Sequence, residues 1–247
     1  MEDSFLKSYL IEQLTTAKKQ LQTIGPEADI EALHRFRVAL RRFRAVLSAF
    51  TKNCYAPDAV VKSMVKVTNP LRETDVFLAS IDKERYPQLH RSVGAYREKE
   101  YKKTWKPKTA ERFGHTLDAL IADLSSLKIN PGKKRLVHTG RALYSAAQKA
   151  RKELTKDSKE SEFHETRLRF KQARYALEFL EETGLMEAGN KISKTKKAQD
   201  HFGAIQDAAN QLEWLHRFCQ NTPSDECSAL YHERKNALKH LKKTFEI

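Results

Sequence analysis

The chain has 247 residues and a strong positive charge, with 46 Lys and Arg against 32 Asp and Glu, a formal net charge of +14 and a pI of about 9.6. Hydrophobic residues make up 40% of it, which is enough for one sizeable core or two smaller halves, and no stretch approaches about 18 uninterrupted apolar residues. These values exclude membrane insertion and predict a polyanionic partner, whether nucleic acid, an anionic membrane surface or inorganic polyphosphate.

The three cysteines, Cys54, Cys219 and Cys227, are odd in number, widely spaced and without a C-x-x-C pair. This pattern predicts neither a disulfide framework nor a zinc site. Because the first residues also lack an apolar segment, we expect a soluble, unexported protein of the reducing cytoplasm.

The chain is predicted to be helical throughout, because it has only 8 Gly and 7 Pro and no sustained alternation of apolar and polar residues. Ser4 can cap the first helix, Gly25 and Pro26 end it, and Pro107 marks a boundary between the halves 1–106 and 107–247. Helices are expected over about 4–24, 27–52, 58–68, 77–86, 88–105, 109–127, 133–154, 160–183, 187–207, 208–219 and 225–244.

The helix over about 27–52 carries two stripes. Its apolar side consists of Phe36, Leu40, Phe43 and Leu47. Beside that side, within an arc of about 80°, lie four basic residues at positions 0, +3, +7 and +10: His34, Arg37, Arg41 and Arg44. Cations so close to the core-facing side repel one another and lose hydration, so an anion is expected nearby. The basic stripe is therefore predicted to form one wall of an anion-binding groove.

The same pattern recurs about 130 residues later, in the helix over about 160–183, beside an apolar side of Phe163, Phe170, Leu177 and Leu180. Its basic residues have the same spacing and are His164, Arg167, Lys171 and Arg174. One basic helix is usually a solvated face, whereas two copies with matched spacing favour a functional role. We predict an all-α fold of two pseudo-symmetric bundle halves of about four helices each, with an extra linking helix in the second, around a central basic groove.

Three motifs resemble those of the CHAD family, whose name describes helical domains built around such histidines. They are H-x-x-R-V-x-x-R-R-x-R at 34–44, H-x-x-R-x-R-x-K-x-x-R-Y-A-L-E-F at 164–179 and F-G-x-x-Q-D at 202–207. The resemblance covers nearly the whole chain and implies a single domain over 1–247. It also implies that the chain binds linear inorganic polyphosphate without catalysis in a basic groove or pore, alone or beside a triphosphatase domain.

The resemblance assigns polyphosphate contact to nine residues: His34, Arg37, Arg41, Arg42, Arg44, His164, Arg167, Lys171 and Arg174. Further candidate contacts are Arg72, Arg135, Arg141, Tyr175, Lys194 and Lys197. Asn69 stands where the family often has glycine, and Glu73 stands where it usually has aspartate.

The chemistry of these residues suits polyphosphate independently of the resemblance. Arginine's planar fork can bridge two phosphate oxygens, and lysine adds a compact charge. Arginines lower the pKa of a neighbouring histidine, whereas bound phosphate raises it, so binding is expected to be mildly favoured by acid.

Two other functions remain open at this point: binding of RNA or DNA, and a role as an accessory or regulatory subunit of a polyphosphate- or triphosphate-hydrolysing enzyme. The phenylalanines of the two helices face the core, so nucleic acid is expected to compete only weakly with polyphosphate. A histidine-dependent phosphatase is disfavoured because neither stripe contains a carboxylate that could act as a base. We expect no enzyme activity, no cofactor and no metal, and we expect the partner to be polyphosphate, including polyphosphate granules in the cytoplasm.

Overall fold

The computed structural model describes residues 4–27, 30–51, 55–155 and 158–244, and throughout these ranges every regular element is a helix. The prediction of an all-α fold is confirmed. The elements are α1 Phe5–Gln20, the 3-10 helix η1 Leu21–Thr23, α2 Ile30–Phe50, α3 Tyr55–Val67, α4 Asn69–Ala79, α5 Pro87–Thr104, α6 Pro107–Ser126, α7 Lys133–Glu153, α8 Glu160–Glu182, α9 Gly189–Asn221 and α10 Asp225–Thr244.

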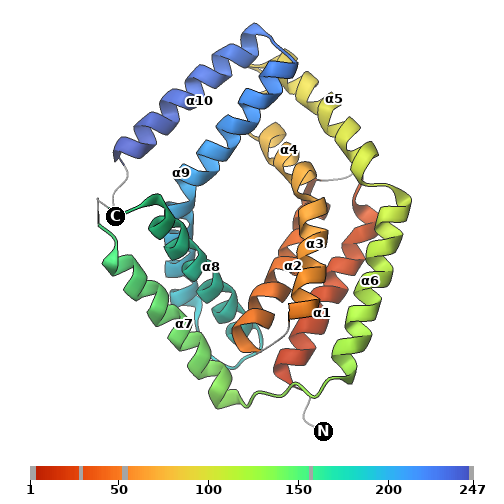
Figure 1. Ribbon diagram of the computed structural model, residues 1–247, viewed down its shortest axis with the longest axis vertical. Helices are drawn as coiled ribbons and strands as arrows, with labels where there is room; N and C mark the ends of the chain where they lie inside the picture. Colours follow the sequence, from red (N-terminus) through yellow and green to blue (C-terminus); the bar gives the residue numbers. More distant parts are fainter. Residues whose placement is uncertain (1–3, 28–29, 52–54, 156–157, 245–247) are drawn as a thin grey trace.

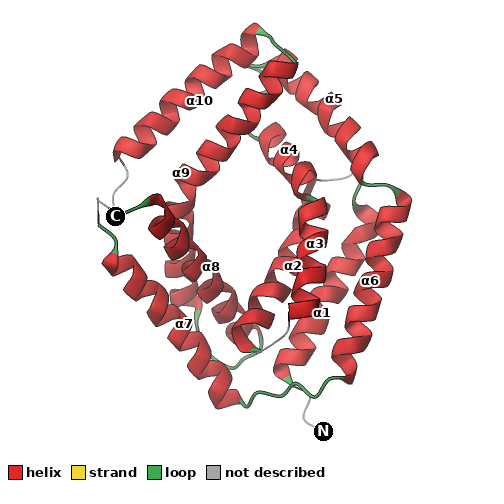
Figure 2. Cartoon of the chain, viewed as in Figure 1, coloured by secondary structure: helices red, strands yellow, loops and turns green. Residues whose placement is uncertain are grey.

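The helices are arranged in two walls that face each other (Figure 1). One wall contains α2, α3 and α4, with α1 and α6 outside α2, and the other contains α8 and α9, with α7 outside α8. The walls meet at one end, where α2 packs against α8, and at the other end, where α5 contacts α10. Figure 2 shows helices and loops, and no strand, in the part of the chain that the structure describes. The two predicted basic helices, α2 and α8, therefore lie on opposite walls.

The largest apolar core lies between α1, α2 and α6 and reaches α8. Phe36 of α2 is 0% exposed and stacks on Phe113 of α6, with the ring centroids 6.2 Å apart. On α8, Phe179 contacts both Tyr9 of α1 and Phe50 of α2. Although the predicted boundary at Pro107 assigns α6 to the second half, α6 packs against α1. The repeat and its boundary stay predictions.

A buried ion pair joins α4 to α5. Asp75 of α4 is 0% exposed and accepts hydrogen bonds from Arg97 Nε at 2.7 Å and from the Tyr101 hydroxyl at 2.8 Å, both on α5. The two bonds satisfy a carboxylate that would otherwise be costly to bury. They fix the orientation of α4, the helix that carries Arg72.

Local signals explain several helix ends. Ser4 caps α1 as predicted, because its Oγ accepts a hydrogen bond from the Lys7 backbone N–H at 3.4 Å. α8 ends at Glu182, and Gly184 follows its C-cap Thr183 with a φ of +67°, in the left-handed region that favours glycine. The end predicted at Lys52 for the helix of the first basic stripe lies outside the described residues.

Two predictions about the C-terminal part are wrong. A single helix, α9, replaces the two helices expected over 187–219, because Gly203 and its neighbours continue the helical path. Cys219 and Cys227 form a disulfide that joins α9 to α10, with their Cα atoms 5.7 Å apart. The cysteine pattern therefore does not support a reducing compartment. Cys54 lies outside the described residues.

Within the described ranges, no helix combines the length and apolar character needed to cross a membrane.

Candidate functional site

The basic stripe of α2 lies where the sequence predicts it, beside the buried side of the same helix. Leu40 and Phe43 are 0% exposed. The four basic residues are each partly buried: His34, Arg37, Arg41 and Arg44. Because Arg is almost never buried unless it is paired, the partners of these side chains decide what the stripe can do.

Arg37 is held by the junction between α3 and α4. Its Nη1 donates to the Val65 carbonyl and to Thr68 Oγ1, both at 2.7 Å, and its Nη2 donates to Asn69 Oδ1 at 2.8 Å. Burial, followed by the neighbouring Arg41 guanidinium, lowers the pKa of Arg37 to about 10. Most of the N–H groups of Arg37 therefore donate to other parts of the protein, and Asn69 helps to orient the guanidinium.

Arg41 and Arg44 continue the stripe toward the end where α2 meets α8. Arg44 forms a bidentate pair with Asp58 of α3, with Nε–Oδ1 and Nη2–Oδ2 distances of 2.7 and 3.1 Å. Arg41 donates from Nε to the Arg37 carbonyl at 3.3 Å. Among the residues that the structure describes, no carboxylate pairs with Arg41. Its remaining N–H groups are available to a ligand.

The stripe of α8 is organised against α9 through the F-G-x-x-Q-D motif. Arg167 Nη2 lies 3.3 Å from Asp207 Oδ1. A Cβ added at Gly203 would lie only 3.2 Å from Arg167 Nε, so glycine at this position leaves room for the arginine. His164, the first residue of the stripe, is exposed and lines a cavity of about 260 Å³ together with Arg167.

The two stripes meet in a cavity of about 500 Å³ between α2 and α8. Arg41 and Arg44 line it from α2, and Lys171 and Tyr175 line it from α8. Burial, followed by the guanidinium of Arg41, lowers the pKa of Lys171 to about 8. In the described part of the chain Lys171 has neither a carboxylate partner nor a hydrogen-bond acceptor. This cavity, called the α2–α8 cavity below, gathers positive charge that the protein only partly neutralises.

A second cavity, of about 440 Å³, lies between α2, α4 and α9. Its basic residues are Arg37, Arg72 and Arg217, and its acidic residues are Glu73, Asp207 and Glu213. Arg72 also acts on the α2 stripe, because burial and then the Arg72 guanidinium lower the pKa of His34. The lowering therefore has the predicted direction at His34, although burial rather than the arginines is its first cause.

Arg42 lies outside both cavities. Its Nη2 is 3.3 Å from Glu178 Oε2 and 3.2 Å from Glu182 Oε1, so Arg42 links α2 to α8. Neither Arg42 nor these two carboxylates line the α2–α8 cavity. Arg174, the last residue of the α8 stripe, also pairs with Glu178, at 3.0 Å. Both arginines have carboxylate partners, which makes them weaker candidates for phosphate contact than Arg41 or Lys171.

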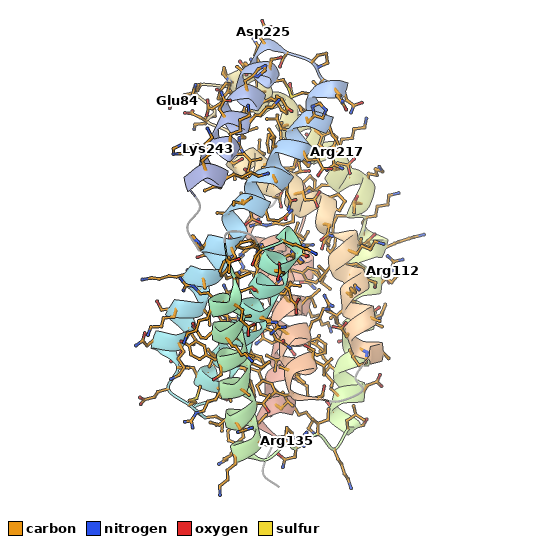
Figure 3. The ribbon with its side chains drawn as sticks, turned by 60° about the vertical axis from the view of Figure 1, so that its left-hand side comes forward. Glu84, Arg112, Arg135, Arg217, Asp225 and Lys243 are labelled. Atoms are coloured by element: carbon orange, nitrogen blue, oxygen red, sulfur yellow. A yellow bond between two sulfur atoms is a disulfide. The ribbon has the colours of Figure 1, made fainter. Side chains whose placement is uncertain are left out.

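The other candidates have different positions. Tyr175 is 2% exposed and lines the α2–α8 cavity, so its ring is packed rather than free to stack on a base. Arg135, Arg141, Lys194 and Lys197 are exposed and line neither the α2–α8 cavity nor the cavity between α2, α4 and α9. Figure 3 shows Arg135 at the end of the molecule opposite to Arg217.

Residues 8–216 match the family model of the CHAD domain. The chain belongs to the CHAD domain family. This CHAD domain is similar to the crystal structure of the CHAD domain from the plant Ricinus communis, with a TM-score of 0.75 and 21% identity over 97% of this chain and 86% of that chain. It is also similar to PptA from Streptomyces chartreusis, with a TM-score of 0.63 and 16% identity over 98% of this chain and 96% of that one.

These likenesses show a shared fold. No curated protein matches the chain. The CHAD family is associated with the binding of polyphosphate or triphosphate.

The sequence did not point to every residue of the CHAD site. Arg217 lies ten residues after Asp207 on α9, and the two were assigned to separate helices, so their common position was missed. Asp58 was not singled out either, although it neutralises Arg44. The sequence pattern gives little indication of this role. Asp58 lies on a neighbouring helix, and a partner on another helix has no fixed sequence spacing from the basic stripe.

Proposed function

We propose that this CHAD domain binds linear inorganic polyphosphate between α2 and α8 and does not hydrolyse it. The observation that carries the proposal is the α2–α8 cavity, where Arg41 and Lys171 face each other without carboxylate partners in the described structure. Mutual repulsion of these cations destabilises the empty site, and a polyanion would relieve it. Burial is the largest cause of the low pKa of Lys171, and the neighbouring guanidiniums, Arg41 first, lower it further.

The spacing of the cations favours a linear anion over a single phosphate. Basic residues one helical turn apart recur at about 5 Å along α2. His34, Arg37, Arg41 and Arg44 therefore place positive charge along a line that starts beside the second cavity and ends in the α2–α8 cavity, with the free N–H groups of Arg41 as its main donors. Polyphosphate repeats its negative charge along a line in the same way, and it can contact several of these residues at once.

Buried aromatic residues argue against single-stranded nucleic acid as the main ligand. Binding of single strands relies on aromatic rings on which bases stack. Phe43 and Phe170 are 0% exposed and Tyr175 is 2% exposed, so the stripes offer positive charge without stacking surfaces. Inorganic polyphosphate needs only the charge and the donors.

Binding without turnover is supported by the state of the carboxylate nearest to the cations. Asp58 lines the α2–α8 cavity, but both of its oxygens accept hydrogen bonds from Arg44. A carboxylate held in this way is a weak general base. We therefore expect no release of orthophosphate when the protein is incubated with long-chain polyphosphate.

A competition experiment tests the proposed function. Affinity for long-chain polyphosphate is measured by calorimetry at several salt concentrations, with tRNA and duplex DNA as competitors and with orthophosphate release as a second readout. We expect tight binding, a logarithm of the affinity that falls linearly with the logarithm of the salt concentration, and little displacement by either nucleic acid. Equal competition by tRNA would contradict the proposal, and steady orthophosphate release would contradict binding without turnover.

A further inference from the structure

Among the lysines that the structure describes, Lys171 is the one whose pKa burial and neighbouring cations lower. It is partly buried on α8 and lines the α2–α8 cavity, which opens to solvent. Four guanidiniums act on it, those of Arg41 and Arg44 from α2 and those of Arg167 and Arg174 from its own helix. The other titratable groups of the cavity are Asp58, which is paired with Arg44, and Tyr175.

These surroundings make the Lys171 amine a nucleophile. Burial and the neighbouring cations lower its pKa to about 8. At pH 7.5 about a quarter of such an amine is neutral, against about a thousandth of an amine with an ordinary lysine pKa. Desolvation and adjacent cations activate catalytic lysines in the same way.

The α2–α8 cavity also suggests which electrophile would reach this amine. Arg41 can hold a phosphate group. The lining of the cavity also has an apolar part, formed by Ala45, Leu47 and Leu168, next to the polar side chains of Ser48, Thr51 and Gln172. Leu168 is 46% exposed, so part of this apolar wall is accessible. A small molecule with an anionic phosphate at one end and an apolar acyl group at the other fits both parts of the cavity.

We propose that Lys171 is a modification site that small acyl phosphates acylate without an enzyme. The lone pair of the neutral Nζ attacks the carbonyl carbon, and a C–N bond forms. The C–O bond to the phosphate breaks, and its electron pair leaves with the phosphate, which Arg41 stabilises. The departing phosphate takes the proton lost from Nζ, so the products are an acyl-lysine amide and hydrogen phosphate.

Acylation would change the properties of the cavity. The amide carries no charge, so the modified site has one cation fewer and more apolar surface. Polyphosphate and acyl phosphate would compete for Arg41, so bound polyphosphate would protect Lys171. The acylation itself does not depend on the proposed function, because it requires only that the cavity accept a phosphate.

The test measures the rate of acylation at each lysine. The full chain is incubated with acetyl phosphate at pH 7.5, and acetylation is followed by peptide mass spectrometry. Lys99 of α5 and Lys194 of α9, both exposed, are the internal references. We expect Lys171 to react at least about tenfold faster than either reference, since the larger neutral fraction outweighs the lower basicity of the amine. A rate at Lys171 no greater than at the references would overturn the inference.

Two variants and one competitor complete the experiment. Arg41→Gln should slow acylation of Lys171 several-fold, whereas Arg112→Gln, which removes an exposed arginine from the outer helix α6, should leave it unchanged (Figure 3). An equal effect of the two variants would contradict a role for the cavity. Rapid acylation that saturating polyphosphate does not slow would contradict the proposed polyphosphate site alone. Polyphosphate binding without rapid acylation would contradict only this inference.

Discussion

At the scale of single residues, the central feature is that Lys171 is destabilising in the ligand-free protein. Its pKa in the folded chain is about 8, lower than the ordinary lysine value, because burial and nearby arginines disfavour the charged form. The cost is therefore fully present below pH 8 and disappears as the pH rises toward the value of the unfolded chain. This cost is consistent with the proposed role of Lys171 in binding an anion.

Lys171→Met should therefore stabilise the protein. We expect the free energy of unfolding at pH 7 to rise by about 1 kcal/mol, because methionine fills similar space without charge. Thermal unfolding without ligand at pH 7 and pH 10 measures this, with a smaller difference at pH 10. Lys194→Met, at an exposed position of α9, is the matched control and should change little. A destabilised Lys171→Met protein would show that the ammonium has a partner at this position.

The affinity for polyphosphate should also depend on pH, because two residues of the site, Lys171 and His34, change their protonation. A bound polyanion raises the pKa of Lys171 above its ligand-free value of about 8, so binding takes up a proton and weakens as the pH rises above 8. His34, whose pKa is lowered in the ligand-free protein, strengthens binding as the pH falls below neutral. Calorimetry between pH 5.5 and 9.5 measures both changes.

Lys171→Arg is the control for this pH dependence, because arginine stays charged throughout the range. The affinity of the Lys171→Arg protein for polyphosphate should stay constant from pH 8 to 9.5. Its affinity should still increase below neutral pH, because His34 is unchanged. If wild type and Lys171→Arg lose affinity equally above pH 8, another group is responsible for the change.

At the scale of helices, close packing between α7 and α8 positions the second basic stripe. Gly140 of α7 is buried, and a Cβ at this position would clash with Leu180 Cδ1 of α8, a side chain that is itself 0% exposed. Gly140→Ala should lower the free energy of unfolding by about 1 to 3 kcal/mol, since the crowded core cannot relax freely.

Gly94→Ala provides the matched control for this change. Gly94 lies within α5, and an added Cβ there has no atom within 4 Å among the described residues. Alanine should stabilise the helix by up to about 1 kcal/mol. Opposite signs for the two substitutions in urea unfolding would confirm the close contact, and equal effects would contradict it.

Helix periodicity predicts most of the helices, but it does not predict where every helix ends or which helices a disulfide joins. The apolar sides of α2 and α8 follow from spacing alone, and Phe36 and Phe170 are buried as expected. The single long α9 differs from the break expected between residues 207 and 208, because the helix continues through the F-G-x-x-Q-D motif, where Gly203 leaves room for Arg167 of α8. The disulfide depends on the short turn that brings Cys219 and Cys227 together, and their spacing of eight residues has no established signature.

At the scale of the whole molecule, the sequence predicts which cations line up but not which remain free for a ligand. Arg37 and Arg44 belong to the predicted stripe, yet the first is held by the α3–α4 junction and the second by Asp58. These partners come from separate helices, and only the assembled fold brings them into contact. Arg41 and Lys171, from opposite walls, become the strongest candidates for the same reason.

The most direct test of the account compares the loss of two charges inside and outside the α2–α8 cavity. The inner variant is Arg41→Gln/Lys171→Gln, and the outer variant is Lys99→Gln/Lys103→Gln on α5, which has the same net charge. Affinity for long-chain polyphosphate is measured for both across a salt series.

We predict that the inner variant loses affinity by tenfold or more, because each charged hydrogen bond contributes about 1.5 to 3 kcal/mol, and that its salt dependence becomes shallower. The outer variant should stay close to wild type. Equal losses in the two variants would show that the charge of +14 acts diffusely and would contradict a site between α2 and α8.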